Sequence, residues 1–118
     1  MKKIFYLSTC DTCKRIINEL GLKEHNFEFQ DIKLKHISGI ELDFCEKALG
    51  SYESLFSRKA RKYKELGLST KNLSESEIRK LILSDYTFLK RPVIIIDQDV
   101  SAGNSKDEVE KVKRKLKK

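Results

Sequence analysis

Residues 2–20, KKIFYLSTCDTCKRIINEL, decide the fold of this chain. The stretch begins with Lys2–Leu7, which is apolar and β-prone and predicts a buried strand. After a short polar step, the side chains that share one face of an amphipathic helix are Cys13, Ile16, Ile17 and Leu20. Gly21 predicts the end of that helix, because glycine readily adopts the left-handed conformation of a C-cap. A second strand is predicted over Phe27–Ile32.

The segment from about residue 38 to residue 85 predicts only helices. Its capping boxes, Ser38-x-x-Glu41 and Ser74-x-x-Glu77, each indicate a helix start. The side chains expected to point inward from the first helix are Ile40, Phe44, Cys45 and Ala48. Between the boxes, apolar side chains from Tyr52 to Leu66 predict one further helix. Because no linker composition surrounds the segment, we interpret it as a helical insert within a single domain, residues 1–118.

The last part of the chain returns to strands. Pro92–Ile96 is an apolar run of strand length, and a polar turn separates it from a short strand over Val100–Ala102, which predicts a hairpin. Ser105-x-x-Glu108 opens a last helix. The order βαβ, helical insert, ββα predicts an α/β fold built on one sheet.

Composition and charge restrict the class of protein. A chain of 118 residues fits one compact domain, and no apolar run approaches membrane-spanning length or a signal-peptide core. We therefore expect a cytoplasmic protein with no membrane partner. The 25 Lys and Arg against 18 Asp and Glu give a net charge of +7, which attracts anions. The basic clusters at 58–64 and 106–118 contain a single aromatic residue, Tyr63, and so lack the repeated aromatic side chains of single-strand nucleic-acid grooves. They are typical of solvated helix faces, and we expect no direct DNA binding.

The pair Cys10-x-x-Cys13 carries the strongest chemical signal. The first cysteine sits where the free N–H groups and dipole of a helix stabilise a thiolate, and the second, one turn later, can close a disulfide with it. Lys14 adds positive charge, whereas Asp11 opposes the effect. Two alternatives remain: a pair of buried structural cysteines, or half of a zinc site. Cys45, His25 and His36 offer no zinc-ligand spacing, so we expect no metal.

Arg91-Pro92 is the second signal. A proline that enters a buried strand belongs at its first position, because it cannot donate to the ladder. A cis peptide there would suit packing against the cysteine loop and would hold Arg91 beside the thiol. The alternative is a plain strand-entry proline with a surface arginine. Two interpretations also remain for Arg58, which could bind an anion or be an ordinary solvated arginine on a helix. Cys45 is expected to be buried and inert.

These motifs resemble one known family, the arsenate reductase (ArsC)/Spx family. The matching segments, in the family's order, are Thr9-Cys10-x-x-Cys13-Lys14, Tyr63-x-x-Leu66-Gly67-Leu68, Leu89-Lys90-Arg91-Pro92-Val93-Ile94-Ile95 and Gly103-Asn104-x-x-Asp107-Glu108. The resemblance covers nearly the whole chain. It implies a thioredoxin-like mixed sheet of about four strands with a helical insert, and a cis proline at Pro92.

The resemblance also implies an activity. In the arsenate reductases a nucleophilic cysteine attacks arsenate, and glutathione with glutaredoxin completes reduction to arsenite while arginines hold the oxyanion. Cys10 falls on the nucleophile and Arg91 on one arginine. Arg58 falls on a second with a one-residue slip that leaves Arg61 as a rival. The chain departs from the reductases in three respects. Tyr6 stands where the reductases carry a histidine, and Lys14 stands where they carry an arginine. A third arginine, expected near Gly103, is missing.

The Spx branch of the family carries the CxxC arrangement seen at Cys10 and Cys13. Spx-like proteins use that pair as a disulfide switch and bind the C-terminal domain of the RNA polymerase α-subunit. They also have a long C-terminal extension, which is not found here.

We therefore expect a thiol-dependent oxidoreductase that acts on arsenate, another small oxyanion or a disulfide. It would hold no bound cofactor and would receive electrons from glutathione and glutaredoxin or from thioredoxin. An Spx-like regulator is the alternative, and a domain that has lost oxyanion turnover is a third reading.

Overall fold

Strand β1 (Lys2–Tyr6) lies inside a four-stranded sheet of order β2-β1-β3-β4. The computed structural model describes residues 1–117. β1 pairs in parallel with β2 (Glu28–Asp31) and antiparallel with β3 (Val93–Ile96), which in turn pairs antiparallel with β4 (Asp99–Ala102). The predicted mixed α/β sheet of about four strands is confirmed. The predicted hairpin joins β3 to β4 through Asp97 and Gln98.

The chain divides into two units, Met1–Lys35 with Arg91–Lys118 and His36–Lys90. Besides the sheet, the first unit holds the α-helices α1 (Asp11–Leu20) and α5 (Lys106–Leu116) and the short 3-10 helix η1 (Leu22–Glu24); the label η marks 3-10 helices throughout. The second unit holds α2 (Gly39–Leu49), η2 (Glu53–Leu55), α3 (Arg61–Glu65), η3 (Leu68–Thr70), α4 (Glu75–Ser84) and η4 (Tyr86–Phe88). The second unit thus contains the whole segment for which the sequence predicts inserted helices.

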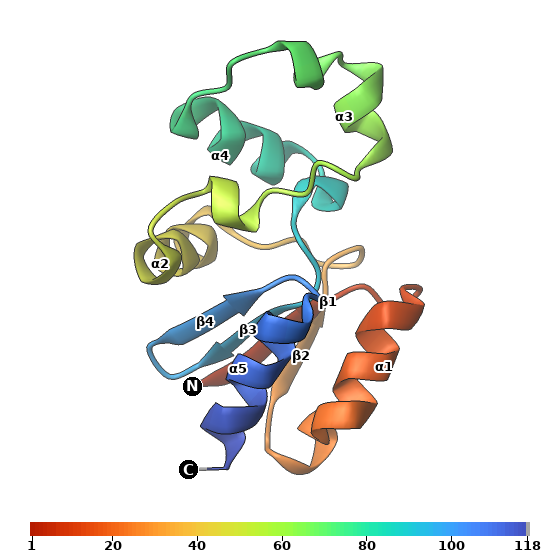
Figure 1. Ribbon diagram of the computed structural model, residues 1–118, viewed down its shortest axis with the longest axis vertical. Helices are drawn as coiled ribbons and strands as arrows, with labels where there is room; N and C mark the ends of the chain where they lie inside the picture. The colour runs from red at the N-terminus through yellow and green to blue at the C-terminus, as the bar shows by residue number, and fades with distance from the viewer. Residues whose placement is uncertain (118) are drawn as a thin grey trace. The chain divides into compact units, whose positions relative to one another are not determined.

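Helices α1 and α5 cover one face of the sheet in the first unit (Figure 1). The buried side chains of this core are Ile4, Ile16, Ile17, Leu20, Leu22, Phe27, Ile94 and Val112. The predicted apolar stripe of α1 is confirmed, because all its members are buried. Gly21 ends α1 in the left-handed conformation, with φ of 62°, as its position predicts. Burial of this stripe fixes the rotation of α1 about its axis, and therefore the direction in which its first turn presents side chains.

Helix α2 begins at the predicted capping box, with Ser38 and Glu41 each satisfying the other's backbone N–H. The predicted inward face is partly wrong. Leu42 and Cys45 are the buried residues, whereas Ile40 is 84% exposed and Ala48 is also exposed. The physical reason is that Leu42 and Cys45, three residues apart, define the buried stripe, and Ile40 lies off that stripe in the first turn.

The single helix predicted between Tyr52 and Leu66 is wrong. The backbone turns through η2 and becomes extended at Phe56, which forms an antiparallel bridge with Leu89. Between Phe56 and Leu66, only α3 is helical. The N–H of Ser57 donates to the Phe88 carbonyl at 2.7 Å. The Phe56 ring also stacks on Phe88 with centroids 5.5 Å apart. Pairing with a distant segment thus replaces the local helical hydrogen bonds, which the periodicity of the sequence does not reveal.

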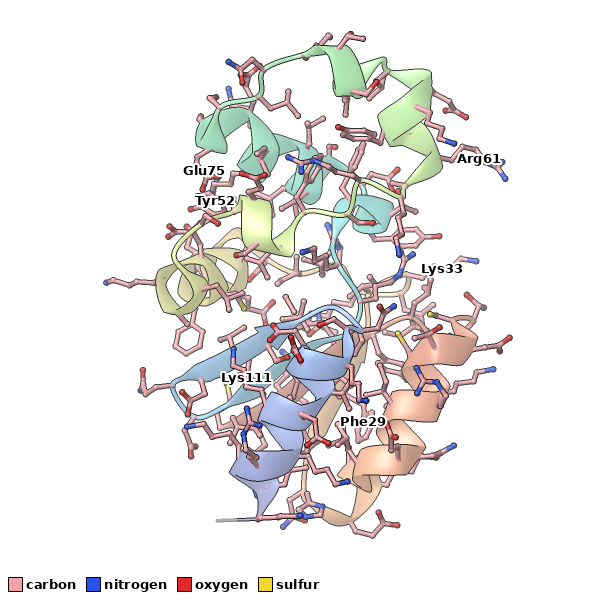
Figure 2. All side chains as sticks on the ribbon, viewed as in Figure 1. Phe29, Lys33, Tyr52, Arg61, Glu75 and Lys111 are labelled. Atoms are coloured by element: carbon pink, nitrogen blue, oxygen red, sulfur yellow. The ribbon has the colours of Figure 1, made fainter. Side chains whose placement is uncertain are left out.

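Helix α4 starts at the second predicted capping box, Ser74 with Glu77. Beside it, Glu75 accepts hydrogen bonds from the backbone N–H groups of Tyr52, at 2.6 Å, and Glu53, at 3.2 Å (Figure 2). This side chain therefore ties the start of α4 to the start of η2. None of the helices within residues 1–117 combines the length and the apolar character that a membrane span requires.

Candidate active site at Cys10 and Cys13

Cys10 is the N-cap residue of α1, with extended backbone angles. Its N–H donates to the Leu7 carbonyl at 3.0 Å, and its own carbonyl accepts from the Lys14 N–H at 3.2 Å. The N–H groups in the first turn of a helix have no partner within the helix, so a group at the N-cap can receive them. The loop after β1 thus places the Cys10 sulfur at the positive end of α1.

The environment of Cys10 favours its thiolate. Partial burial raises the pKa of Cys10, but the Cys13 N–H, the Cys13 thiol, the Thr12 N–H and the charge of Arg91 lower it, and the net shift is below the ordinary value of 9.0. Hydrogen bonds and a positive charge that act on the ionised form stabilise it relative to the thiol. Cys10 is therefore the more acidic thiol of the pair.

Cys13 behaves in the opposite way. It is fully buried, and burial raises its pKa to about 11, with further increases from the hydrogen bond and charge of Cys10. The Leu7 N–H and Arg91 act against this rise. Cys13 therefore ionises at a higher pH than Cys10, and its S–H stabilises the thiolate form of Cys10. Both cysteines are free thiols in this structure.

Arg91 enters the site from the start of β3, and its peptide bond to Pro92 is cis. The Pro92 carbonyl accepts from the Gly103 N–H at 2.9 Å, so Pro92 is joined to the end of the hairpin. Among the groups that shift the thiol pKa values most, Arg91 is the cation, and it acts on both cysteines. Lys14 is exposed in the first turn of α1. The structure thus brings Cys10, Cys13 and Arg91 together.

The loop before Cys10 is held by a pair of residues that the sequence analysis missed. The Ser8 hydroxyl donates to the Asp31 carboxylate at 2.5 Å, and this bond holds the pKa of Asp31 below its usual value. Asp31 ends β2, which is the parallel neighbour of β1. The available signal was an aspartate at the carboxyl end of a predicted strand, because such ends meet at one edge of a parallel pair.

The remaining predicted residues belong to the second unit. Arg58 binds Glu53 at 2.8 Å, and Arg61 is exposed and extends away from α3 (Figure 2). Cys45 is fully buried, and burial raises its pKa to about 12, so its thiol is a poor nucleophile at neutral pH. Within residues 1–117, no group of three or more His, Cys, Asp or Glu side chains is arranged to hold a metal ion.

Known proteins resemble this chain in sequence and in fold. The global transcriptional regulator Spx of Streptococcus pyogenes serotype M1 is 24% identical over 114 residues, covering 92% of this chain and 82% of that protein. An arsenate reductase from Vibrio cholerae has the same fold, with a TM-score of 0.79 at 18% identity over 94% of this chain and 96% of that one. A Staphylococcus aureus COL protein solved by solution NMR matches with a TM-score of 0.76 at 27% identity, covering 94% of this chain and 97% of that one.

The family comparison covers most of the sheet and the whole cysteine loop. The pattern of the ArsC family matches residues 5–112, which include Cys10, Cys13, Arg91 and Pro92. Because that match spans most of the chain and the fold agrees with solved relatives, this protein belongs to the ArsC family.

Proposed function

We propose that this chain is a cytoplasmic thiol oxidoreductase that reduces arsenate or a related small oxyanion, with Cys10 as the nucleophile and Cys13 as the resolving thiol. The observation that carries the proposal is the position of Cys10 as the N-cap of α1, one turn before the buried Cys13, together with the opposite shift of the two thiol pKa values. In such a pair the first thiol forms the attacking thiolate more readily, while the second thiol keeps its proton at neutral pH.

The proposed chemistry balances in two steps. The Cys10 thiolate attacks the arsenic of arsenate, a sulfur–arsenic bond forms, and one arsenate oxygen leaves as water after taking up protons. Cys13 then loses its proton and attacks the Cys10 sulfur, while the electron pair of the sulfur–arsenic bond stays on arsenic, which leaves as arsenite. Arsenic(V) has been reduced to arsenic(III), and the two thiols have been oxidised to a disulfide.

The second step requires Cys13 to become more acidic once Cys10 has reacted. The thiolate charge of Cys10 and its hydrogen bond are two of the causes that raise the pKa of Cys13. Bond formation at Cys10 removes both, so the pKa of Cys13 falls as the attack on Cys10 becomes necessary. Glutathione with glutaredoxin, or thioredoxin, would return the disulfide to two thiols.

Recognition of the oxyanion would rest on Arg91 and the free N–H groups at the start of α1. Lys14 supplies charge without the two-pronged geometry of arginine, so we expect weaker orientation of a tetrahedral anion and slow turnover. Whether an arginine of the second unit contributes is tested by comparing Arg58→Gln with Arg61→Gln. A loss of activity in one variant alone identifies the ligand.

The deciding experiment is an arsenate reduction assay with glutathione and glutaredoxin, and in parallel with thioredoxin and its reductase. The proposal predicts slow arsenite formation that is lost in Cys10→Ser. Removal of a positioned charge contact to the transition state costs about 2–4 kcal/mol, so Arg91→Met should slow the reaction about 30-fold or more. Equal rates for the wild type and Cys10→Ser with every donor would contradict the proposal.

A second candidate function follows from the Spx relatives, which match 92% of this chain at 24% identity. In this reading the Cys10–Cys13 pair is a redox switch, and the partner is the C-terminal domain of the RNA polymerase α-subunit. A pull-down with that domain, using reduced and diamide-oxidised protein, tests it. Redox-dependent capture that is abolished in Cys13→Ser would favour the regulator over the enzyme.

A further inference from the structure

The carboxylate of Asp31 holds the loop that precedes Cys10. Its Oδ2 accepts the Ser8 hydroxyl at 2.5 Å, and the Ser8 backbone N–H also stabilises the charged carboxylate. Tyr6, the last residue of β1, lies opposite Asp31 in the register of the parallel pair. The contact therefore joins the carboxyl ends of two neighbouring strands just where the chain leaves β1 for the cysteines.

Asp31 is itself held in place by hydrogen bonds from the residues that follow it in the chain. Its other carboxylate oxygen accepts from the Lys33 N–H at 3.1 Å, and its carbonyl accepts from the N–H groups of Leu34, at 3.1 Å, and Lys35, at 2.9 Å. The next residue, Ile32, donates to the Tyr6 carbonyl at 2.9 Å. Asp31 is thus an anchored acceptor, and hydrogen bonds to a charged acceptor are stronger than those between neutral groups.

The loop that Asp31 holds contacts both cysteines through Leu7, the neighbour of Ser8: the backbone of Cys10 and the sulfur of Cys13. The Leu7 carbonyl accepts the Cys10 N–H at 3.0 Å, and the Leu7 N–H stabilises the ionised form of Cys13. A displacement of Ser8 would therefore move a group that orients Cys10 and a group that faces the Cys13 sulfur.

We propose that Asp31 is a positioning residue for the cysteine pair: acting through Ser8, it fixes Leu7 against both cysteines and so sets the reactivity of Cys10. The inference rests on the proposed function in taking Cys10 and Cys13 as the reacting thiols.

A positional role and a purely electrostatic role of Asp31 predict opposite changes in the acidity of Cys10, so the two roles can be distinguished. If Asp31 acted only through its negative charge, removing that charge would make Cys10 more acidic, because a nearby negative charge disfavours a thiolate. If it acts by position, truncation frees the loop and makes Cys10 less acidic. Asp31→Asn keeps an acceptor oxygen for Ser8 but removes the charge. Asp31→Ala removes both.

The experiment is the rate of Cys10 alkylation against pH, together with the equilibrium of the Cys10–Cys13 disulfide in glutathione buffers. We expect Asp31→Ala and Ser8→Ala to slow alkylation at pH 7 about 3- to 10-fold, the range that loss of one ordinary hydrogen bond corresponds to. Asp31→Asn and Ser8→Thr should keep wild-type rates within about twofold, because each retains the hydrogen-bonding partner. Both alanine variants should also shift the disulfide equilibrium.

Asp97→Ala is the matched control, because Asp97 binds the N-terminal amine at 2.7 Å beside the start of β1, in the same unit. The inference is overturned if Asp31→Ala changes thiol reactivity no more than this control does, or if it lowers only the melting temperature. Faster alkylation in both Asp31→Ala and Asp31→Asn would also overturn it, in favour of a charge effect. An ordinary thiol at Cys10 in the wild type would instead remove the proposed function itself.

Discussion

Cys13 lies one helical turn after Cys10, and the pKa values of the two thiols are shifted in opposite directions. The pKa of Cys10 lies below its ordinary value, because N–H groups, the Cys13 thiol and Arg91 outweigh its partial burial. Burial raises the pKa of Cys13 to about 11. Each thiol contributes to the shift of the other, since the Cys13 S–H stabilises the Cys10 thiolate and that thiolate disfavours ionisation of Cys13. The pair therefore titrates as a coupled unit.

We predict that Cys10 is the first thiol of the pair to ionise. In Cys13→Ser, alkylation of Cys10 should have a midpoint below 9.0, the ordinary value for a thiol. In Cys10→Ser, Cys13 should react only at higher pH, but with a midpoint below its wild-type value, because the charge of Cys10 is gone. Mass spectrometry of alkylated peptides across a pH series measures both. A more acidic Cys13 than Cys10 would reverse the assignment.

A Cys10–Cys13 disulfide should form under mild oxidation, with Cys45 left as a free thiol. The first two cysteines are one turn apart, whereas Cys45 is fully buried and its pKa is raised to about 12 by that burial. Diamide treatment followed by peptide mapping tests the pairing, and Cys45→Ala serves as the control that should leave it unchanged. Cys45 recovered in a bridge with either partner would contradict this expectation.

The parts of the fold that could be predicted from the sequence are those determined by local pattern. The apolar stripe that ends at Leu20 predicted α1, and the capping boxes at Ser38 and Ser74 predicted the starts of α2 and α4. In each case the side chains that define the element lie within a few residues of one another. The box at Ser105 is only half formed, because the Glu108 carboxylate accepts from the Ala102 N–H at 3.1 Å instead.

What could not be predicted depends on partners distant in sequence. Phe56 leaves the helical conformation because its backbone pairs with Leu89. The Ser8–Asp31 bond spans 23 residues and exists only because β1 and β2 are adjacent and parallel. In the site, the acidity of Cys10 could be predicted from its place before a helix, but the rise for Cys13 follows from burial that only the fold reveals.

Asp85 should make the stability of the second unit decrease at acidic pH. Its partial burial raises the pKa of Asp85, but hydrogen bonds from Lys62, at 2.7 Å, and Thr87 hold that pKa at about 2, below its ordinary value of 3.8. Because the folded-state pKa is the lower one, this stabilisation is present above about pH 4 and is lost as the pH falls through about 2.

The change that tests this acid dependence is Asp85→Asn. We expect it to lower the free energy of unfolding by roughly 1–2 kcal/mol at pH 7, after allowance for the solvent exposure of Lys62. Urea unfolding at pH 7 and pH 2 measures the effect, and the difference from wild type should shrink at the lower pH. A difference that stays constant across this range would show that the carboxylate charge is not its source.

The last prediction concerns the cation of the site. Arg91 lowers the pKa of both Cys10 and Cys13, whereas Lys14, also basic and close in sequence to Cys10, is exposed in the first turn of α1. We therefore expect Arg91→Met to slow Cys10 alkylation at pH 7 about 2- to 5-fold, which corresponds to roughly 0.5–1 kcal/mol for a partly exposed charge pair. Lys14→Met is the matched control and should change the rate less than Arg91→Met does. Raising the salt concentration should narrow the gap between wild type and Arg91→Met, because counterions screen the interaction. Equal effects of the two substitutions would mean that net charge, and not the placement of Arg91 at the start of β3, controls the acidity of Cys10.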